Sequence, residues 1–365
     1  MATDRAIAEQ LFARFQAAGA VPVDADILLP ADTLLDLYGE DIRARAYVTS
    51  DPLEGEMMLR PDFTVPVVQK HMTHGAEPAR YTYMGEVFRR QEHRGLRARE
   101  YLQVGYELFA RDTPEDADAE VFALFSEVLA PLGLRPATGD IGILMAAVRG
   151  LSTSDRRKAA LLRHIWRPRR FRLLLDRFGG RRPEPEPRLK LLAALADTAP
   201  AALMETAGPA IGLRGEDEIT DRAAALIDDA ATPPLSAAEV DILEDVLMLR
   251  DTAPNALGHL RDAVVDLPAI APAVDRFARR LDALAARGID VETLDFEASH
   301  GRTTLEYYDG FVFSFHAEGR ADLPPIASGG RYDALTRVLG QGRSIPAVGG
   351  VIRPGLVAEL TGDGA

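Results

Sequence analysis

The protein has 365 residues, 47% of them hydrophobic and 27% charged, which is enough for two or three domains with at least one sizeable core. It contains no cysteine, so disulfides and thiolate metal sites are excluded and a reducing compartment is indicated. A formal net charge of −14 argues against a dedicated nucleic-acid binder, because such proteins usually carry a basic surface. The N-terminus lacks the pattern of a signal peptide, and no apolar run is long enough to span a bilayer. We therefore expect a cytoplasmic protein without membrane partners.

Residues 1–145 mix helical and strand-like segments. Apolar residues at helical spacing predict an N-terminal helix with one buried face: Ala8, Leu11, Phe12 and Phe15. Aromatic and β-branched residues over 81–88 and 102–109 predict antiparallel strands joined by an exposed, charged loop at 90–99. Residues 115–132 then predict an amphipathic helix.

Residues 146–290 change in character, because Ala, Leu, Arg and Asp dominate and the apolar spacing is helical. Breaks that contain proline divide this part into several helices. Eight arginines and one acid lie between Arg163 and Arg182. This run is suited either to nucleic acid or to a solvated or partner-facing helix surface, and we favour the helix surface.

Residues 291–365 return to a β-pattern. Tyr307 and Tyr308 predict the start of a strand that continues over 311–315, so at most one of the two rings can face a pocket. The pair Gly329–Gly330 predicts a tight turn rather than a phosphate loop, and a helix follows from Asp333. The fold class we predict is α+β, with an antiparallel sheet flanked by helices built from residues 1–145 and 291–365, and a helical insertion at 146–290.

The segment 81–109 carries the most informative polar residues. Positions 103, 105 and 107 share one face of the second strand, so Gln103 and Glu107 point the same way, and Arg89 enters from the neighbouring strand. A cation, an amide and a carboxylate that converge on a sheet suit a zwitterionic ligand with a polar side chain. A surface ladder of ion pairs is the alternative on spacing alone. His71 and His74 have the spacing of two metal ligands, but a solvated helix end explains them better, and we expect no metal.

Six blocks of the sequence, in order, resemble class II aminoacyl-tRNA synthetases, and histidyl-tRNA synthetase in particular. They resemble motif 1 with its proline at Pro30, the segment for the amino acid's α-amino group, motif 2, the two histidine-specific signatures, and the entry to motif 3. The blocks are residues 21–30, 59–64, 81–109, 305–308, 329–333 and 346–349. The resemblance implies a class II core and a histidine pocket formed by Asp62, Thr64, Arg89, Gln103, Glu107 and Tyr308.

Three departures from the synthetase pattern bear on function. Thr303 and Leu356 stand where the histidyl enzyme has arginines that act on ATP, and positioned cations supply much of the catalysis at phosphorus. A shifted alignment would restore a cation from Arg302 or Arg353. In the segment that resembles the binding site for the α-amino group, Asp62 stands where the family has a longer acidic side chain. The given sequence also ends nine residues after Leu356, so we expect no anticodon-binding domain.

These features together resemble the histidyl-tRNA synthetase-like regulatory subunits of ATP phosphoribosyltransferase. That resemblance implies a non-catalytic protein without a cofactor, which partners a short catalytic subunit and responds to L-histidine, either in the synthetase-like pocket or at a subunit junction. It also implies a homodimer within a larger hetero-oligomer, since motif 1 builds a two-fold interface and Ile27, Leu28 and Leu29 precede Pro30. The alternative is an enzyme that activates or transfers histidine with ATP.

Overall fold

A mixed sheet forms the centre of the protein in the computed structural model, which describes residues 2–31, 46–90, 98–208, 212–302 and 307–362. Two of its pairs, β1–β5 and β7–β9, are parallel and the rest are antiparallel. The described strands lie in the spatial order β1 (Val21–Pro22), β5 (Ala79–Phe88), β6 (Glu100–Phe109), β12 (Ala347–Ile352), β11 (Ala327–Arg331), β10 (Phe311–His316), β7 (Arg135–Asp140), β9 (Asp295–Glu297) and β8 (Arg250–Thr252). Strands from both ends of the chain therefore share one sheet, as predicted.

Helices α1 (Ala2–Ala17) and α5 (Pro114–Leu129) pack against one face of this sheet. The alternation of β10 places Phe313 toward α5, where its ring lies 5.6 Å from Phe122 and 5.5 Å from Phe125. The predicted N-terminal helix buries Ala8, Leu11 and Phe15 as expected. A short 3-10 turn, η1 (Ala130–Leu132), follows α5, and α16 (Pro354–Thr361) packs against α1.

The opposite face of the sheet is covered by α4 (Thr64–His74) and α15 (Asp333–Leu339), which contact each other. Beside them lies a three-stranded antiparallel sheet in the order β2 (Leu28–Pro30), β4 (Gly55–Leu59) and β3 (Val48–Asp51). This face holds the predicted site residues.

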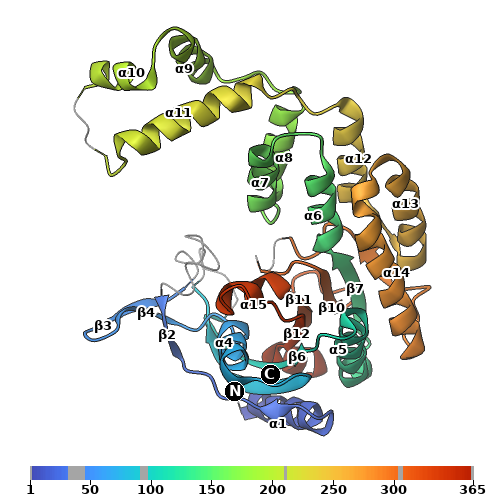
Figure 1. The fold of residues 1–365 in the computed structure, drawn as a ribbon. Coiled ribbons are helices and arrows are strands. Elements are labelled where there is room, and N and C mark those ends of the chain that lie inside the picture. Colours follow the sequence, from blue (N-terminus) through green and yellow to red (C-terminus); the bar gives the residue numbers. More distant parts are fainter. Residues whose placement is uncertain (1, 32–45, 91–97, 209–211, 303–306, 363–365) are drawn as a thin grey trace.

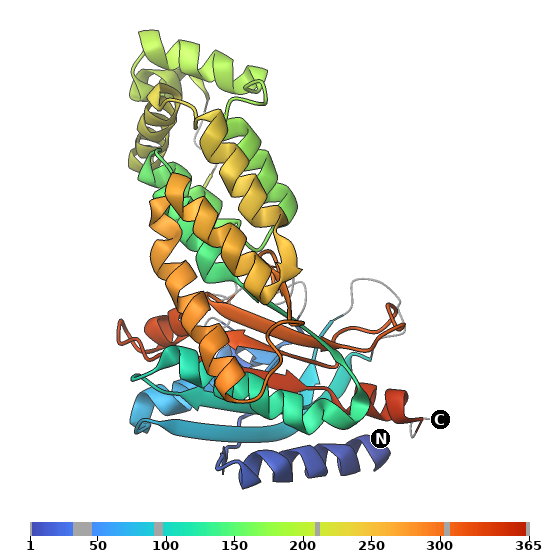
Figure 2. The same ribbon diagram turned by 90° about the vertical axis from the view of Figure 1, so that its right-hand side faces the viewer.

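The helices predicted between 146 and 290 are present (Figure 1). They are α6 (Ile141–Gly150), α7 (Asp155–Arg163), α8 (Pro168–Phe178), α9 (Glu186–Asp197), α10 (Pro200–Thr206), α11 (Glu216–Ala231), α12 (Ala237–Met248), α13 (Ala253–Asp266), the 3-10 turn η2 (Pro268–Ile270) and α14 (Ala271–Ala286). Two parts of this range join the core: β8 forms an edge of the central sheet, and α14 packs along α5. Helices α9, α10 and α11 instead extend away from the sheet (Figures 1 and 2).

Three local predictions were wrong. Gly329 and Gly330 lie inside β11 rather than in a turn, because their missing side chains let neighbouring strands and rings approach. Tyr307 and Tyr308 precede β10 rather than start it. His71 is buried, 1% exposed, and its ring stacks on Phe109 at 3.9 Å, so it is no solvated helix end. Most of the predicted loop at 90–99 lies outside the described residues. No described helix is long and apolar enough to cross a membrane.

Candidate ligand site on the central sheet

One narrow cavity collects all of the residues that the sequence predicted for the site. Its free volume is only about 10 Å³, roughly the room of one water molecule, so an amino-acid ligand requires the lining side chains to move apart. The residues that line it are Asp62, Thr64, Arg89, Gln103, Glu107, Tyr307, Tyr308, Tyr332, Gly349, Gly350, Val351 and Arg353. The predicted set of six is therefore brought together from four separate segments of the chain.

Strand register and glycines create the space for this cavity. Glu107 on β6 lies opposite Gly349 on β12, which in turn lies opposite Gly330 on β11. A Cβ at Gly349 would overlap the Glu107 carboxylate, and one at Gly330 would come within 2.9 Å of the Tyr308 ring. The glycines of two of the recognised sequence blocks therefore serve to leave room for these side chains.

Glu107 is the buried centre of the cavity, with 1% of its surface exposed. Its Oε1 accepts hydrogen bonds from the Thr64 hydroxyl at 3.1 Å and from the Tyr83 hydroxyl at 3.0 Å. Its Oε2 accepts from the Tyr332 hydroxyl at 2.6 Å. The carboxylate is thus held in place by three neutral donors.

Burial raises the pKa of Glu107 to about 7, although the hydrogen bonds from Tyr332, Tyr83 and Thr64 oppose that rise. The nearby Asp62 carboxylate raises it further. A carboxyl group with this pKa is partly protonated near neutrality, and a ligand that brings an N–H donor or a positive charge would favour its ionised form.

Gln103 provides an unpaired amide on the same strand face. Its side chain is 0% exposed, and neither Oε1 nor Nε2 has a hydrogen-bond partner within the described residues. An unsatisfied buried amide is unfavourable by roughly 1–3 kcal/mol for each group. Because Gln103 lines the cavity, a ligand with both donor and acceptor groups would remove this penalty.

The remaining predicted residues place charge around the cavity. Asp62 is 4% exposed, and its Oδ1 accepts from the Thr64 backbone N–H at 3.1 Å, just before α4 begins. Arg89 follows β5, and its Nε donates to the Pro61 carbonyl at 3.0 Å. Two acids, Asp62 and Glu107, and two cations, Arg89 and Arg353, therefore line the same cavity as the unpaired amide, a combination that suits an amino acid.

Six lining residues were not in the predicted set, and three of these have polar side chains: Tyr307, Tyr332 and Arg353. Tyr307 donates to the Thr64 hydroxyl at 3.3 Å, so both tyrosines of the pair reach the cavity; the rule of strand alternation does not apply because this segment is not a strand. Tyr332 lies in a recognised sequence block, but only the folded sheet brings it to Glu107. Arg353 donates to the Pro325 carbonyl at 2.7 Å and to Ser328 Oγ at 3.1 Å.

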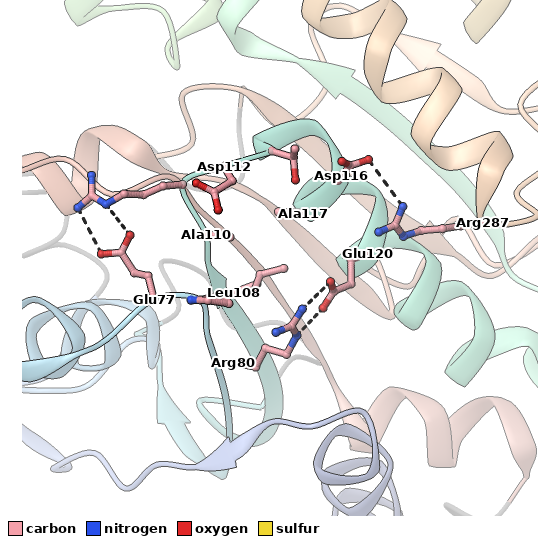
Figure 3. Close-up of a pocket in the computed structure, with 12 residues that line it drawn as sticks. Glu77, Arg80, Leu108, Ala110, Asp112, Asp116, Ala117, Glu120 and Arg287 are labelled. Atoms are coloured by element: carbon pink, nitrogen blue, oxygen red, sulfur yellow. Dashed lines mark hydrogen bonds and ion pairs between the residues drawn. The ribbon is translucent and has the colours of Figure 1, made fainter.

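A second hollow lies beyond the ends of β5 and β6, beside α5 (Figure 3). Three ion pairs line it: Arg80–Glu120 at 2.7 Å, Arg111–Glu77 at 2.6 Å and Arg287–Asp116 at 3.9 Å. Every arginine of this hollow is thus already neutralised by a carboxylate, so it makes a weaker ligand site than the cavity around Glu107.

The arginine-rich run spans the end of α7 and all of α8. Arg177 pairs with Asp229 at 3.3 Å, Arg172 with Glu244 at 3.6 Å, and Arg181 with both Asp241 and Glu244. These pairs show that part of the run holds the insertion together. No group of three or more potential metal ligands occurs in the part of the chain that the structure describes.

Comparison with known proteins identifies the family. An ATP phosphoribosyltransferase regulatory subunit from Brucella canis is 33% identical over 345 residues, which cover 90% of this chain and 89% of that protein. The chain belongs to the ATP phosphoribosyltransferase regulatory subunit family.

One family model and two solved structures agree with the fold described above. The family model for histidyl-tRNA synthetase matches residues 1–227 and 216–354. A crystal structure described as an ATP phosphoribosyltransferase regulatory subunit/histidyl-tRNA synthetase from Bacillus halodurans has a TM-score of 0.68 at 20% identity, covering 98% of this chain and 79% of that one. A histidine–tRNA ligase subunit from Alicyclobacillus acidocaldarius has a TM-score of 0.59 at 25% identity and covers 99% of this chain and 93% of that one. The fold is that of the class II aminoacyl-tRNA synthetases.

The positions that separate this family member from a synthetase can now be placed. Thr303 lies outside the described residues. Leu356 lies in α16 and packs against the core. Arg302 turns toward the insertion, where its Nε donates to the Ile165 carbonyl at 2.6 Å and its guanidinium lies 5.0 Å from the Phe171 ring. Arg353 alone of the two alternative arginines lines the cavity.

Proposed function

We propose that the protein is the non-catalytic regulatory subunit that a short catalytic ATP phosphoribosyltransferase subunit requires for activity in the first step of histidine biosynthesis. The observation that carries this proposal is the 33% identity to a relative of that name across 90% of the chain. As a biosynthetic component it works in the cytoplasm and needs no cofactor.

The cavity around Glu107 is the proposed binding site for L-histidine as a feedback effector. Arg89 holds the carboxylate of the amino acid, Asp62 and Thr64 hold its amino group, and Glu107 meets the imidazole, which has an N–H donor in either charge state. The unpaired amide of Gln103 supports this assignment, because a polar ligand would satisfy it. Tyr307, Tyr308 and Tyr332 enclose the site.

Regulation follows if histidine binds one state of the complex more tightly than the other. By linkage, the catalytic partner then changes the affinity for histidine by the same factor, typically about 1–3 kcal/mol of coupling free energy. The partner's activity is thereby inhibited when histidine accumulates.

The rival function is ATP-dependent activation of histidine. The replacement of synthetase arginines by Thr303 and Leu356, and the engagement of Arg302 with Ile165 and Phe171, support loss of that chemistry. Arg353 favours the rival, since it brings a cation to the cavity, and so does the match to the histidyl-tRNA synthetase family model. Exchange of pyrophosphate into ATP should be absent with histidine present, and robust exchange would establish the rival.

The decisive experiment combines the purified protein with the short catalytic subunit and measures ATP phosphoribosyltransferase activity with and without histidine. We expect activity only when both proteins are present, and inhibition by histidine. The variant Glu107→Gln should weaken histidine binding about 10- to 100-fold and blunt inhibition, since a hydrogen bond to a charged group contributes roughly 1.5–3 kcal/mol. It should leave assembly unchanged.

Glu120→Gln is the control, because Glu120 is a carboxylate outside the cavity, partly buried, that pairs with Arg80 in the second hollow (Figure 3). Undiminished inhibition in the Glu107→Gln complex would place the effector elsewhere, at a junction with the catalytic subunit. A catalytic subunit that is fully active alone would refute the regulatory function itself.

A further inference from the structure

The helices α9, α10 and α11, within residues 184–208 and 212–231, form a projecting unit that we call the arm (Figures 1 and 2). Its described residues include only three that are buried: Leu195, Ala225 and Asp229. In α11, two of sixteen residues are buried, whereas α14, also sixteen residues long, buries seven. The arm therefore has almost no core of its own.

Such a unit lacks the usual source of helix stability. Helices of this length are marginal in water, and most of their stability in proteins comes from packing an apolar face. The arm keeps large apolar side chains in contact with solvent instead. Their exposed fractions are 52% for Leu189, 47% for Leu191, 108% for Leu213, 37% for Ile219 and 41% for Ile227.

Helix α11 presents a continuous apolar stripe. Ile219, Ala223 and Ile227 are spaced four residues apart, so they lie along one side of the helix over roughly 12 Å. Ile219 and Ile227 keep 37% and 41% of their surface exposed, and Ala223 between them is half-buried. Exposed stripes of this kind mark surfaces that bind another protein through an apolar groove or helix face.

The charge of the arm indicates the chemistry of its partner. Residues 184–231 contain ten acids and four bases, a net charge of −6. Glu216, Asp217, Asp221 and Asp228 are exposed along α11, and no ion pair joins them to other described residues. An acidic rim repels nucleic-acid phosphate and favours a protein surface with basic residues around an apolar centre.

We propose that the arm is the docking surface for the catalytic subunit, which meets it with an apolar groove rimmed by basic residues. The inference rests on the proposed function, because it assigns the partner required there to a place on this chain. The stripe on α11 supplies the apolar contact, and the surrounding acids steer association and set its salt dependence.

The test measures binding of the full-length protein to the short catalytic subunit at low and high salt. The double variant Ile219→Lys and Ile227→Lys should weaken binding at least about tenfold, as central apolar contacts of an interface do. Val265→Lys is the matched control: Val265 is 80% exposed on α13, outside the arm, and its replacement should leave binding unchanged. Circular dichroism should show both variants folded, since all three side chains are exposed.

A second variant tests the charge argument without touching the stripe. Glu216→Gln, Asp217→Asn and Asp221→Asn together should slow association and flatten its salt dependence, with dissociation nearly unchanged. If the wild-type protein binds the catalytic subunit and both arm variants bind it equally tightly, the inference is wrong and the proposed function stands. Failure of the wild-type protein to bind the catalytic subunit at all would overturn both. If the lysine variants alter only self-association, measured by sedimentation of the protein alone, the arm binds a second copy and the inference is wrong.

Discussion

At the scale of single residues, Glu107 combines deep burial with a hydrogen-bond shell of neutral hydroxyls. Thr64, Tyr83 and Tyr332 orient the carboxylate without neutralising it. A buried acid of this kind is unfavourable in its ionised form, and the raised pKa of about 7 expresses that penalty. A ligand that brings a positive charge or an N–H donor would stabilise the ionised carboxylate and would therefore bind favourably.

The pH dependence of stability should reveal this penalty. The folded pKa of Glu107 lies above the unfolded value, so the native state holds its proton more tightly, and that contribution to stability is lost as pH rises through about 7. The variant Glu107→Gln has no carboxyl group at this position, so it does not undergo this loss of stability. Between about pH 5 and about pH 8 the free energy of unfolding of the variant should gain about 2–3 kcal/mol relative to wild type, without histidine present. Denaturant titrations at both pH values measure it, and a difference that does not vary with pH would contradict the assignment.

Gly349 should be as important to the cavity as any polar residue. A methyl group there overlaps the Glu107 carboxylate and comes within 2.7 Å of the Tyr106 carbonyl. Gly349→Ala should therefore abolish detectable histidine binding by calorimetry and lower stability by about 1–3 kcal/mol through overpacking. Gly258→Ala is the control, because a Cβ at this position in α13 meets no atom within 4 Å and should raise stability by up to about 1 kcal/mol.

At the scale of elements, a buried ion network joins the insertion to the sheet. Asp118 on α5 accepts from Arg280 of α14 at 2.8 Å and from Arg331 of β11 at 2.7 Å, and all three side chains are buried. Arg280 also contacts Asp140, which caps the start of α6. Arg331 immediately precedes Tyr332, so the same strand end that contacts the insertion also supplies a donor to Glu107.

Removing the shared acid should test the strength of this junction. Asp118→Ala leaves two buried arginines short of a counter-charge, and breaking such a pair typically lowers stability by about 3–5 kcal/mol. Arg279→Ala, whose partner Glu115 is also on α5 but whose own side chain is 58% exposed, should change stability by less than about 1 kcal/mol. Thermal unfolding distinguishes the two, and equal effects would mean that the network is not what joins these elements.

At the scale of the whole molecule, the described residues in and next to the small sheet include exposed apolar side chains. Ile27 is 46% exposed and Leu28 is 44% exposed, while Leu29 between them and Pro30 is buried. This is the segment that resembles motif 1, which builds the two-fold interface of class II synthetases. Closed two-fold symmetry would bury both exposed side chains against a second copy.

We expect a homodimer at micromolar concentration, and Ile27→Glu with Leu28→Glu should shift it to monomer in sedimentation experiments. Placing charges at the centre of an apolar interface leaves them without partners, which is unfavourable by several kcal/mol. Val265→Glu changes a more exposed apolar residue, on α13, and should leave the dimer intact. A wild-type protein that sediments as a monomer would refute the expectation directly.

Local sequence pattern determined which residues share a face. Alternation placed Gln103 and Glu107 on one side of β6, and helical spacing placed Ala8, Leu11 and Phe15 in the core, because these relations depend only on the geometry of one element. Resemblance to a family then grouped the six site residues, and the cavity contains all of them.

Tertiary structure determined the contacts between residues that lie on different helices and strands. Tyr332 reaches Glu107 across 225 positions of sequence, through three paired strands whose order no local pattern specifies. Gly329 and Gly330 look like a turn in sequence, yet they belong to a strand, because the need for glycine comes from rings and backbone that approach from elsewhere. Likewise β8 joins the sheet from within the helical range, and Tyr307 lines the cavity because its segment is not part of a strand, which the alternation rule assumes. Each of these outcomes depends on contacts between distant segments, which form only when the whole sheet assembles.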